Sequence, residues 1–248
     1  MILLEEIRRN PVKGLGQEVL QSTLLTAGRP IGWDRVWAVT HGNSEFDDDR
    51  PAWVKSRNHV IQSTNPALAQ VTCRYNEAAG ELTLSHPDLG EITANPAING
   101  QRIADWIAPI AAPSGPPPYR IVSVPGGNLH DFEDTHLSIG NLASLRALEE
   151  MAGMKLERIR FRMNLWIDGA APWEEFDWYG QDIALGGARL KIIGRVKRCN
   201  ATNANPQTGQ RNAEIPKLLY ERFKHMDFGI YAQVADGGEI KTGDMVSP

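Results

Sequence analysis

Short stretches of alternating hydrophobic and polar residues dominate the chain and predict a protein built mainly from β-strands. The clearest of these stretches are Arg35–Thr40, Leu68–Tyr75, Glu81–Ser85, Ile121–Val124, Asn164–Ile167, Ala188–Ile193 and Gly229–Val234. The chain contains 23 glycines and 16 prolines, which break it into short pieces and favour strands and turns over long helices.

Helical spacing is clearest over Asn141–Ala152. Its apolar residues recur at every third position and predict one buried face: Leu142, Leu145, Leu148 and Met151. Asn141 is the candidate N-cap of this helix. Two weaker helical patterns lie at Ile98–Ile107 and Ile215–Phe223.

A proline-rich segment, Ala111–Pro118, is the best candidate for a domain boundary. Three consecutive prolines exclude both a helix and a central strand there. We therefore expect two β-rich units, residues 1–110 and 119–248, joined by a linker at 111–118.

Composition and charge narrow the class of protein. Lys and Arg total 26 against 30 Asp and Glu, a net charge of −4, which argues against a nucleic-acid-binding protein. No apolar run approaches the ~20 residues that span a bilayer. The start, Met1–Glu6, is too short and too soon acidic for a signal peptide. Cys73 and Cys199 fit no disulfide framework, so we expect free thiols and a cytoplasmic protein.

Several common catalytic and binding motifs are missing from the sequence, including the dinucleotide, P-loop, nucleophile-elbow and zinc-protease motifs. His130 and His136 lie in one acidic segment with Asp131, Glu133 and Asp134, but their spacing fits no regular zinc motif. A solvated acidic loop is the favoured interpretation of this segment.

The segment around Cys199 stands out chemically. A predicted strand leads into Arg195, Lys197 and Arg198, then the cysteine, and then a turn between Pro206 and Gly209. Nearby cations favour the thiolate, the form of cysteine that attacks electrophiles or binds a soft metal. The alternative is a small buried Cys199 at a solvated strand end, and the residues alone leave both interpretations open.

This segment resembles the signature of the MOSC domain, named after the C-terminal part of molybdenum cofactor sulfurases. Other stretches resemble elements of the same family in the same order: Asn10–Gly14, Trp33–Trp37, Arg160–Gly169, Pro172–Trp178, Phe228–Tyr231 and Gly238–Asp244. The resemblance implies a mainly β, β-rich α+β fold, in which an N-terminal β-barrel-like domain precedes a MOSC β-barrel with a few peripheral helices.

The resemblance also implies a molybdopterin-type molybdenum cofactor held between the two domains. Cys199 would be the protein ligand to molybdenum and a catalytic residue, and Asp134 a proton donor or substrate anchor. The pterin and its phosphate would be held by Lys13, Gly14, Arg35, Thr135, Arg162, Asn164, Lys197, Arg198 and Tyr231. Guanidinium groups suit a phosphate because they form paired hydrogen bonds with it.

Three residues depart from the family pattern. Gly14 and Lys197 stand where serine is usual, and Met163 where proline is common. Gly14 removes a hydroxyl but keeps a backbone N–H, while Lys197 adds charge beside the cysteine. These departures affect the expected reaction more than the expected fold.

The implied activity is that of a molybdenum-dependent oxidoreductase, similar to the mitochondrial amidoxime-reducing component and its bacterial counterparts. It would reduce N-hydroxylated compounds by oxygen-atom transfer to molybdenum. Because no C-x4-C-x2-C iron–sulfur spacing occurs, we expect a separate ferredoxin or flavoprotein as electron donor. The alternatives are a cofactor carrier or sulfur-transfer module that uses Cys199, and a binding module without metal.

Overall fold

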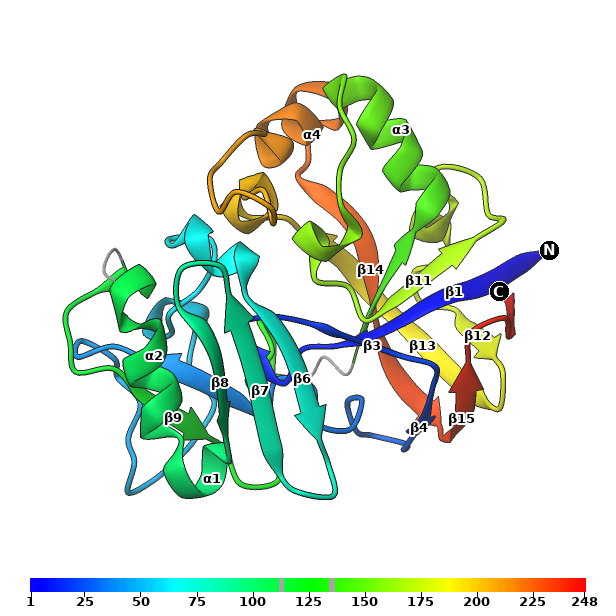
Figure 1. The fold of residues 1–248 in the computed structure, drawn as a ribbon. Helices are drawn as coiled ribbons and strands as arrows, with labels where there is room; N and C mark the ends of the chain where they lie inside the picture. Colours follow the sequence, from blue (N-terminus) through cyan, green and yellow to red (C-terminus); the bar gives the residue numbers. More distant parts are fainter. Residues whose placement is uncertain (112–113, 134–136) are drawn as a thin grey trace.

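The structure is a computed structural model that describes residues 1–111, 114–133 and 137–248. Two β-rich units lie side by side, a closed barrel and a smaller unit made of two sheets (Figure 1). The predicted β-rich α+β class is confirmed, and so is a barrel in the C-terminal half.

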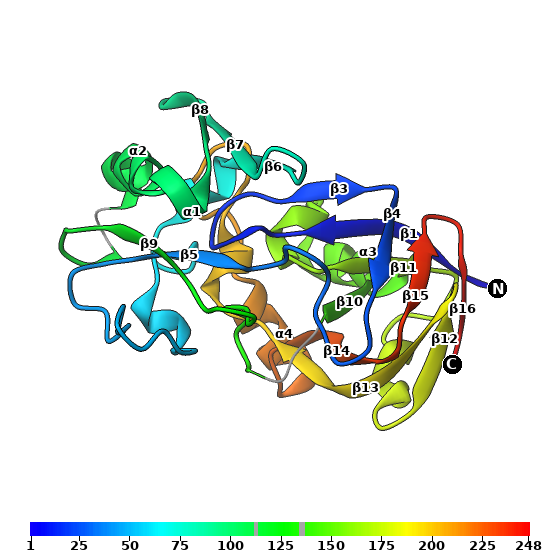
Figure 2. The ribbon, with the colours of Figure 1, turned by 90° about the horizontal axis from the view of Figure 1, so that it is seen from below.

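The barrel is a ring of seven strands. Figure 2 shows these strands from below. In order they are β1 (Ile2–Arg9), β11 (Leu165–Asp168), β10 (Leu137–Asn141), β14 (Asp227–Asp236), β13 (Ala188–Lys197), β12 (Asp182–Leu185) and β16 (Met245–Ser247). β1 closes the ring because it pairs antiparallel with both β11 and β16. β10 and β11 run parallel. Outside the ring, β3 (Glu18–Leu20) pairs with β1, and β4 (Ser22–Leu25) pairs with β15 (Gly238–Lys241).

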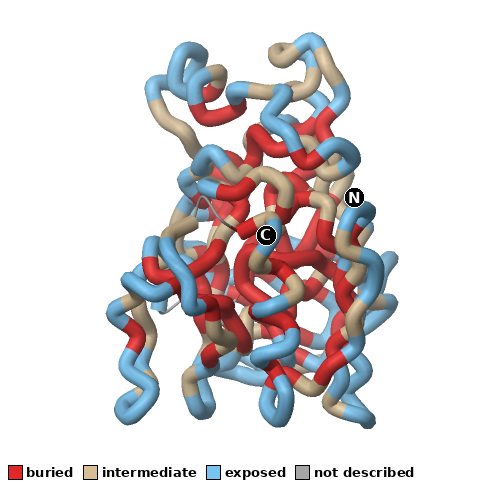
Figure 3. Tube along the Cα trace, turned by 60° about the vertical axis from the view of Figure 1, so that its left-hand side comes forward, coloured by how far each residue is buried: buried red, intermediate tan, exposed pale blue. Residues whose placement is uncertain are grey.

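Alternation along the strands fills the barrel. On β13, Leu190 and Ile192 are buried inside, while Arg189 and Lys191 are exposed on the outer face. On β1, Leu4 and Ile7 are fully buried in the same core. Each such side chain contributes about 1.5–3 kcal/mol by leaving water. Figure 3 shows the buried residues running through the interior and the exposed residues at the outer loops.

The smaller unit contains two sheets of three strands. One sheet holds β2 (Val12–Lys13), β5 (Trp37–Thr40) and β9 (Arg120–Ser123), and the other holds β6 (Thr72–Asn76), β7 (Glu81–His86) and β8 (Gly90–Ala94). Helices α1 (Pro96–Asn99) and α2 (Gln101–Ala111) follow β8, and α2 buries Ile103 and Ile107 in the core of this unit. This is the region in which a barrel-like domain was expected.

Strand pairing crosses the predicted boundary in both directions. β1, from the N-terminal segment, is part of the C-terminal barrel, whereas β9, after the proline-rich segment, pairs with β5 of the smaller unit. Residues 112 and 113 of the predicted linker lie outside the described residues. The division at 111–118 therefore stays a prediction, and the chain passes between the units beside the pocket described below.

The predicted helices form. The two on the barrel are α3 (Leu142–Ala152), in which Asn141 Oδ1 accepts a hydrogen bond from the N–H of Ala143, and α4 (Ile215–Phe223). Short 3₁₀ turns are η1 (Ser56–Asn58), η2 (Pro66–Gln70), η4 (Arg158–Phe161), η5 (Glu174–Trp178) and η6 (Asn200–Asn203). The predicted strand Leu68–Tyr75 is wrong in its first half, which η2 occupies. Pro66 starts that turn because its fixed φ suits a first helical position.

None of the helices in the described part of the chain has the length and apolar character that crossing a bilayer requires.

Candidate functional site

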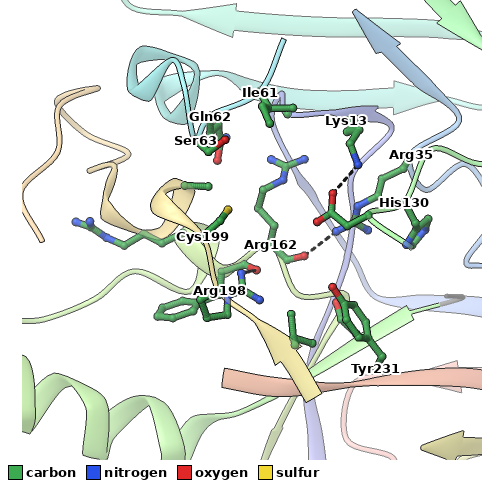
Figure 4. Close-up of a pocket in the computed structure, with 17 residues that line it drawn as sticks. Lys13, Arg35, Ile61, Gln62, Ser63, His130, Arg162, Arg198, Cys199 and Tyr231 are labelled. Carbon is green, nitrogen blue, oxygen red and sulfur yellow. Dashed lines mark hydrogen bonds and ion pairs between the residues drawn. The ribbon is translucent and has the colours of Figure 1, made fainter. Parts of the chain in front are cut away.

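A pocket opens between the barrel and the smaller unit (Figure 4). The smaller unit contributes Lys13, Gly14, Arg35 and the loop 61–63, and the barrel side contributes Arg162, Arg198, Cys199 and Tyr231. The segment before β10 adds His130 and Asp131. The cavity volume is about 90 Å³, and the pocket is partly open to solvent.

Cys199 lies at the rim of this pocket and its side chain is exposed. It lies two residues after the end of β13 and caps η6, where its carbonyl oxygen accepts hydrogen bonds from the N–H (3.2 Å) and the hydroxyl (2.9 Å) of Thr202. These bonds hold the backbone of Cys199 while the thiol stays free. The interpretation of Cys199 as a small buried residue is wrong.

Basic side chains crowd the other walls. Arg162 Nη1 donates to the carbonyl of Leu15, and Arg35 Nη2 donates to the carbonyl of Arg162 at 2.9 Å. Burial lowers the pKa of Arg162 to about 9, and the charge of Arg35 adds to this effect. Burial also lowers the pKa of Arg198, whose Nε has no hydrogen-bond partner among the described residues. Such a cluster is stabilised by an anion.

Asp131 supplies one negative charge to the cluster. Its carboxylate accepts hydrogen bonds from Lys13 Nζ at 2.6 Å and from Ser56 Oγ at 2.7 Å. Desolvation would raise the pKa of Asp131, but Lys13, Ser56 and Arg35 together hold the pKa well below its usual range. Asp131 is exposed, as the interpretation of a solvated acidic loop predicts, but the fold also brings its carboxylate against the buried Lys13, 118 positions away.

A second layer of buried residues holds Arg35 in place. Asp34 is fully buried and pairs with the Arg35 guanidinium and, at 3.0 Å, with His130 Nε2. Its other oxygen accepts a hydrogen bond from the N–H of Asn10 at 2.6 Å. Burial alone would raise the pKa of Asp34, but Arg35 and His130 hold it well below its usual range. His130 is thus buried and paired, which the sequence interpretation of a solvated loop did not anticipate.

Two predicted cofactor contacts do not line the pocket. Asn164 is fully buried, and its Oδ1 accepts hydrogen bonds from the N–H and hydroxyl of Ser138, both at 3.1 Å. Lys197 is exposed on β13, opposite Asp227 of β14. Their cofactor roles stay predictions. Asp134 and Thr135 lie outside the described residues.

Tyr231, on β14, lies in the pocket wall. Phe132 packs against its ring edge-on, with 5.5 Å between ring centroids. Burial raises the pKa of Tyr231 to about 12, so its hydroxyl is protonated at neutral pH and can donate a hydrogen bond.

The loop 61–63 is a part of the site that the sequence analysis missed. Ile61, Gln62 and Ser63 lie across the pocket from Cys199 and Arg198 (Figure 4). No motif or charge pattern marks them in the sequence, because they reach the pocket only through the packing of the 60–61 backbone on Gly14.

Gly14 shows why serine is absent at this position. Its φ is +79°, and a Cβ on Gly14 would lie 2.5 Å from the carbonyl oxygen of Val60. The backbone of the 60–61 segment therefore packs directly on Gly14 and leaves no room for a side chain.

We expect Gly14→Ser to lower the free energy of unfolding by about 2–4 kcal/mol, from left-handed strain plus the clash. Gly28→Ser is the matched control, because Gly28 has a φ of +69° with nothing within 4 Å of its Cβ position. That control should cost only the strain, about 1 kcal/mol. Urea denaturation of both variants measures the difference, and equal losses would contradict a clash at Gly14.

The fold and the pocket define a class: a closed β-barrel protein with a basic pocket and an exposed thiol at its rim. Residues 126–247 match the MOSC domain family. The chain is a MOSC domain protein, as the resemblance predicted.

Relatives with described roles match parts of the chain. Human molybdenum cofactor sulfurase is 34% identical over 92 residues, covering 37% of this chain and 10% of that protein. Human mitochondrial amidoxime-reducing component 1 is 28% identical over 116 residues, covering 42% of this chain and 34% of that protein. The matches thus span 10% and 34% of these two relatives' length. Among solved structures, the YUAD protein of Bacillus subtilis aligns with a TM-score of 0.48 and 12% identity, over 99% of this chain and 94% of that one.

Proposed function

We propose that the protein binds the molybdenum cofactor in this pocket and uses it to reduce N-hydroxylated compounds. The observation that supports the proposal is one exposed thiol, Cys199, at the rim of a pocket walled by Lys13, Arg35, Arg162 and Arg198. A phosphate-bearing cofactor with a thiolate-bound metal needs both features together.

The residues present fit such a group. The unpartnered Nε of Arg198 is a buried donor without an acceptor, and the crowding of Arg35 and Arg162 leaves positive charge that a phosphate would balance. Cys199 offers sulfur, the ligand type that molybdenum in a sulfur environment accepts. Within the described ranges no three His, Cys, Asp or Glu side chains gather to hold a metal ion. Cys199 is the protein ligand that we propose.

Each residue has a distinct task in this proposal. Lys13, Arg35 and Arg162 bind the phosphate through charge-assisted hydrogen bonds, and the buried Asp34 keeps Arg35 oriented. Cys199 holds the metal through its sulfur, and the protonated hydroxyl of Tyr231 donates a hydrogen bond within the pocket. When bound, the cofactor supplies the two-electron chemistry that reduces an N–O bond. Asp134 remains the proposed proton donor, and a separate ferredoxin or flavoprotein the proposed electron donor.

A second function is favoured by the exposure of Cys199. An accessible thiol beside cations is suited to attack. Cys199 could take the outer sulfur of a donor persulfide, with the donor leaving as a thiolate, or the protein could pass the cofactor to another enzyme. In that case Cys199 would be modified and the N-hydroxylated substrate would not turn over.

Expression in a host that makes the cofactor tests both proposals. The molybdenum-to-protein ratio and pterin fluorescence report binding, and anaerobic reduction of benzamidoxime by reduced viologen reports the reaction. Loaded protein that reduces benzamidoxime supports the oxidoreductase. Loaded protein that is inactive but accepts labelled sulfur at Cys199 supports the carrier, and protein without molybdenum contradicts both cofactor-based functions.

The carboxylate of Asp131 competes with any anion for Lys13. We expect Asp131→Asn to tighten binding of inorganic phosphate by about fivefold, a modest gain because the side chain is 64% exposed and partly screened by solvent. Isothermal calorimetry at low ionic strength measures this, with Glu91→Gln on the exposed face of β8 as control. Weaker phosphate binding in the Asp131 variant would show that Asp131 positions Lys13 instead of competing for it.

A further inference from the structure

The chain that follows Cys199 forms a small rigid hairpin over residues 203–212. The N–H of Asn205 donates to the carbonyl of Gln210 at 2.7 Å, and the N–H of Asn212 donates to the carbonyl of Asn203 at 3.0 Å. At the tip, Asn205 Oδ1 accepts hydrogen bonds from the N–H groups of Gln207 (2.7 Å) and Thr208 (3.2 Å). Its geometry is therefore set by its own hydrogen bonds.

The base of the hairpin is fixed to the barrel side. The guanidinium of Arg160, whose side chain is fully buried, pairs with Glu157 and donates to Asn212 Oδ1 at 2.8 Å. Asn203 Oδ1 accepts a hydrogen bond from the N–H of Ile215, the first residue of α4. Movement of the hairpin is thereby tied to movement of η6 and Cys199.

The tip of the hairpin lies against the smaller unit. Gln70 Nε2 donates to the carbonyl of Gln207 at 2.8 Å, and Arg211 Nη2 donates to the carbonyl of Ser63 at 2.8 Å. Gly209, with a φ of +66°, is buried, and a Cβ there would overlap Gln70 Oε1 and lie 3.0 Å from Ala67 Cα. Glycine is what allows the two backbones to approach this closely.

The residues that the hairpin touches are continuous with the pocket wall. The N–H groups of Thr64 (3.3 Å) and Asn65 (3.0 Å) both donate to the carbonyl of Ile61, which makes 61–65 a tight turn leading into η2. On the other side, the 60–61 backbone rests on Gly14. The loop 61–63 is thus held between Gly14 and the hairpin.

We propose that the hairpin 203–212 is a clasp that holds the loop 61–63 at a fixed separation from Cys199. Gln70, Gly209 and Arg211 are its positioning residues, and none of them lines the pocket. The clasp determines how tightly the two halves of the pocket hold a bound group. This effect on binding rests on the proposed function, whereas the link between the hairpin and the loop 61–63 does not.

Hydrogen exchange tests the link in protein prepared without cofactor. The double variant Gln70→Ala/Arg211→Ala removes both side-chain bonds, and Gln210→Ala, an exposed residue of the same hairpin, is the matched control. We expect amides of 61–65 to exchange about tenfold faster in the double variant, with β13 and β14 unchanged, because opening is local. Gly209→Ala should give the same pattern by pushing the tip away from η2. Unchanged exchange at 61–65 in both would overturn the clasp.

Retention of molybdenum tests the consequence for the site. Holoprotein of each variant is dialysed, and molybdenum and pterin are followed over time. Loss about tenfold faster in the double variant than in the control supports the clasp as a determinant of retention. Faster exchange with unchanged molybdenum loss overturns that role. If the wild-type protein holds no molybdenum, the proposed function fails, and the exchange result alone supports or overturns the link.

Discussion

Replacing Cys199 by Ala should reduce the molybdenum content of protein made in a cofactor-competent host by more than about a hundredfold. The reason is that losing a metal ligand lowers metal affinity more than losing a contact that supports a ligand. Cys199 provides an exposed thiol at the pocket rim, and the described residues contain no group of three His, Cys, Asp or Glu side chains that could hold a metal ion elsewhere. Reduction of benzamidoxime should disappear together with the metal.

Cys73→Ala is the control for loss of a thiol elsewhere. Cys73 is buried on β6, and burial raises the pKa of its thiol, so it does not compete for metal at neutral pH. This variant should keep its molybdenum. Wild-type molybdenum and turnover in Cys199→Ala would remove Cys199 from the proposed oxidoreductase function.

Arg162→Met should weaken retention of the cofactor by about 3 kcal/mol, roughly a hundredfold, because a buried charge-assisted pair to phosphate would be lost. Arg162 lies among Arg35 and Lys13, where burial and like charge already lower its pKa. Methionine has a similar length and no charge. Arg162→Lys should recover part of the loss, since it restores the charge without the paired donors of a guanidinium.

Arg162 also joins the two units, so stability must be measured beside retention. Its guanidinium donates to the carbonyl of Leu15, and removing it leaves that oxygen without this donor, at a cost of about 1–3 kcal/mol. Arg146→Met is the control, because Arg146 pairs with Asp168 on the exposed surface, where such a pair contributes about 0–1 kcal/mol. A folded Arg162→Met protein that retains molybdenum as well as wild type would contradict phosphate binding at this position.

Local features of the sequence were sufficient to predict the elements with strong periodicity. The Leu142–Met151 spacing and the Asn141 cap predict α3, and the alternation of Ala188–Ile193 predicts the first part of β13. The prediction of a strand over Arg35–Thr40 was less accurate. Arg35 has a φ of 52°, and β5 begins at Trp37, because Arg35 turns toward the pocket to meet Asp34.

The predicted site residues also fall into two groups, those that line the pocket and those that do not. Cys199, Lys13, Arg35, Arg162, Arg198 and Tyr231 were singled out from motifs, and the structure brings them to one pocket. Asn164 and Lys197 were singled out by the same motifs, yet one supports the backbone of Ser138 and the other faces solvent. A motif identifies a residue, but the direction of its side chain depends on neighbours that are distant in the sequence.

The sequence by itself therefore determined the β-rich class, the helices and the cysteine with its basic neighbours, since each depends on residues close together in the chain. Only the tertiary structure decided that β1 closes the barrel between β11 and β16, that Asp131 meets Lys13, and that the loop 61–63 faces Cys199. These contacts join segments far apart in sequence. Their stability comes from shared burial and charge pairing, which no local pattern of residues records.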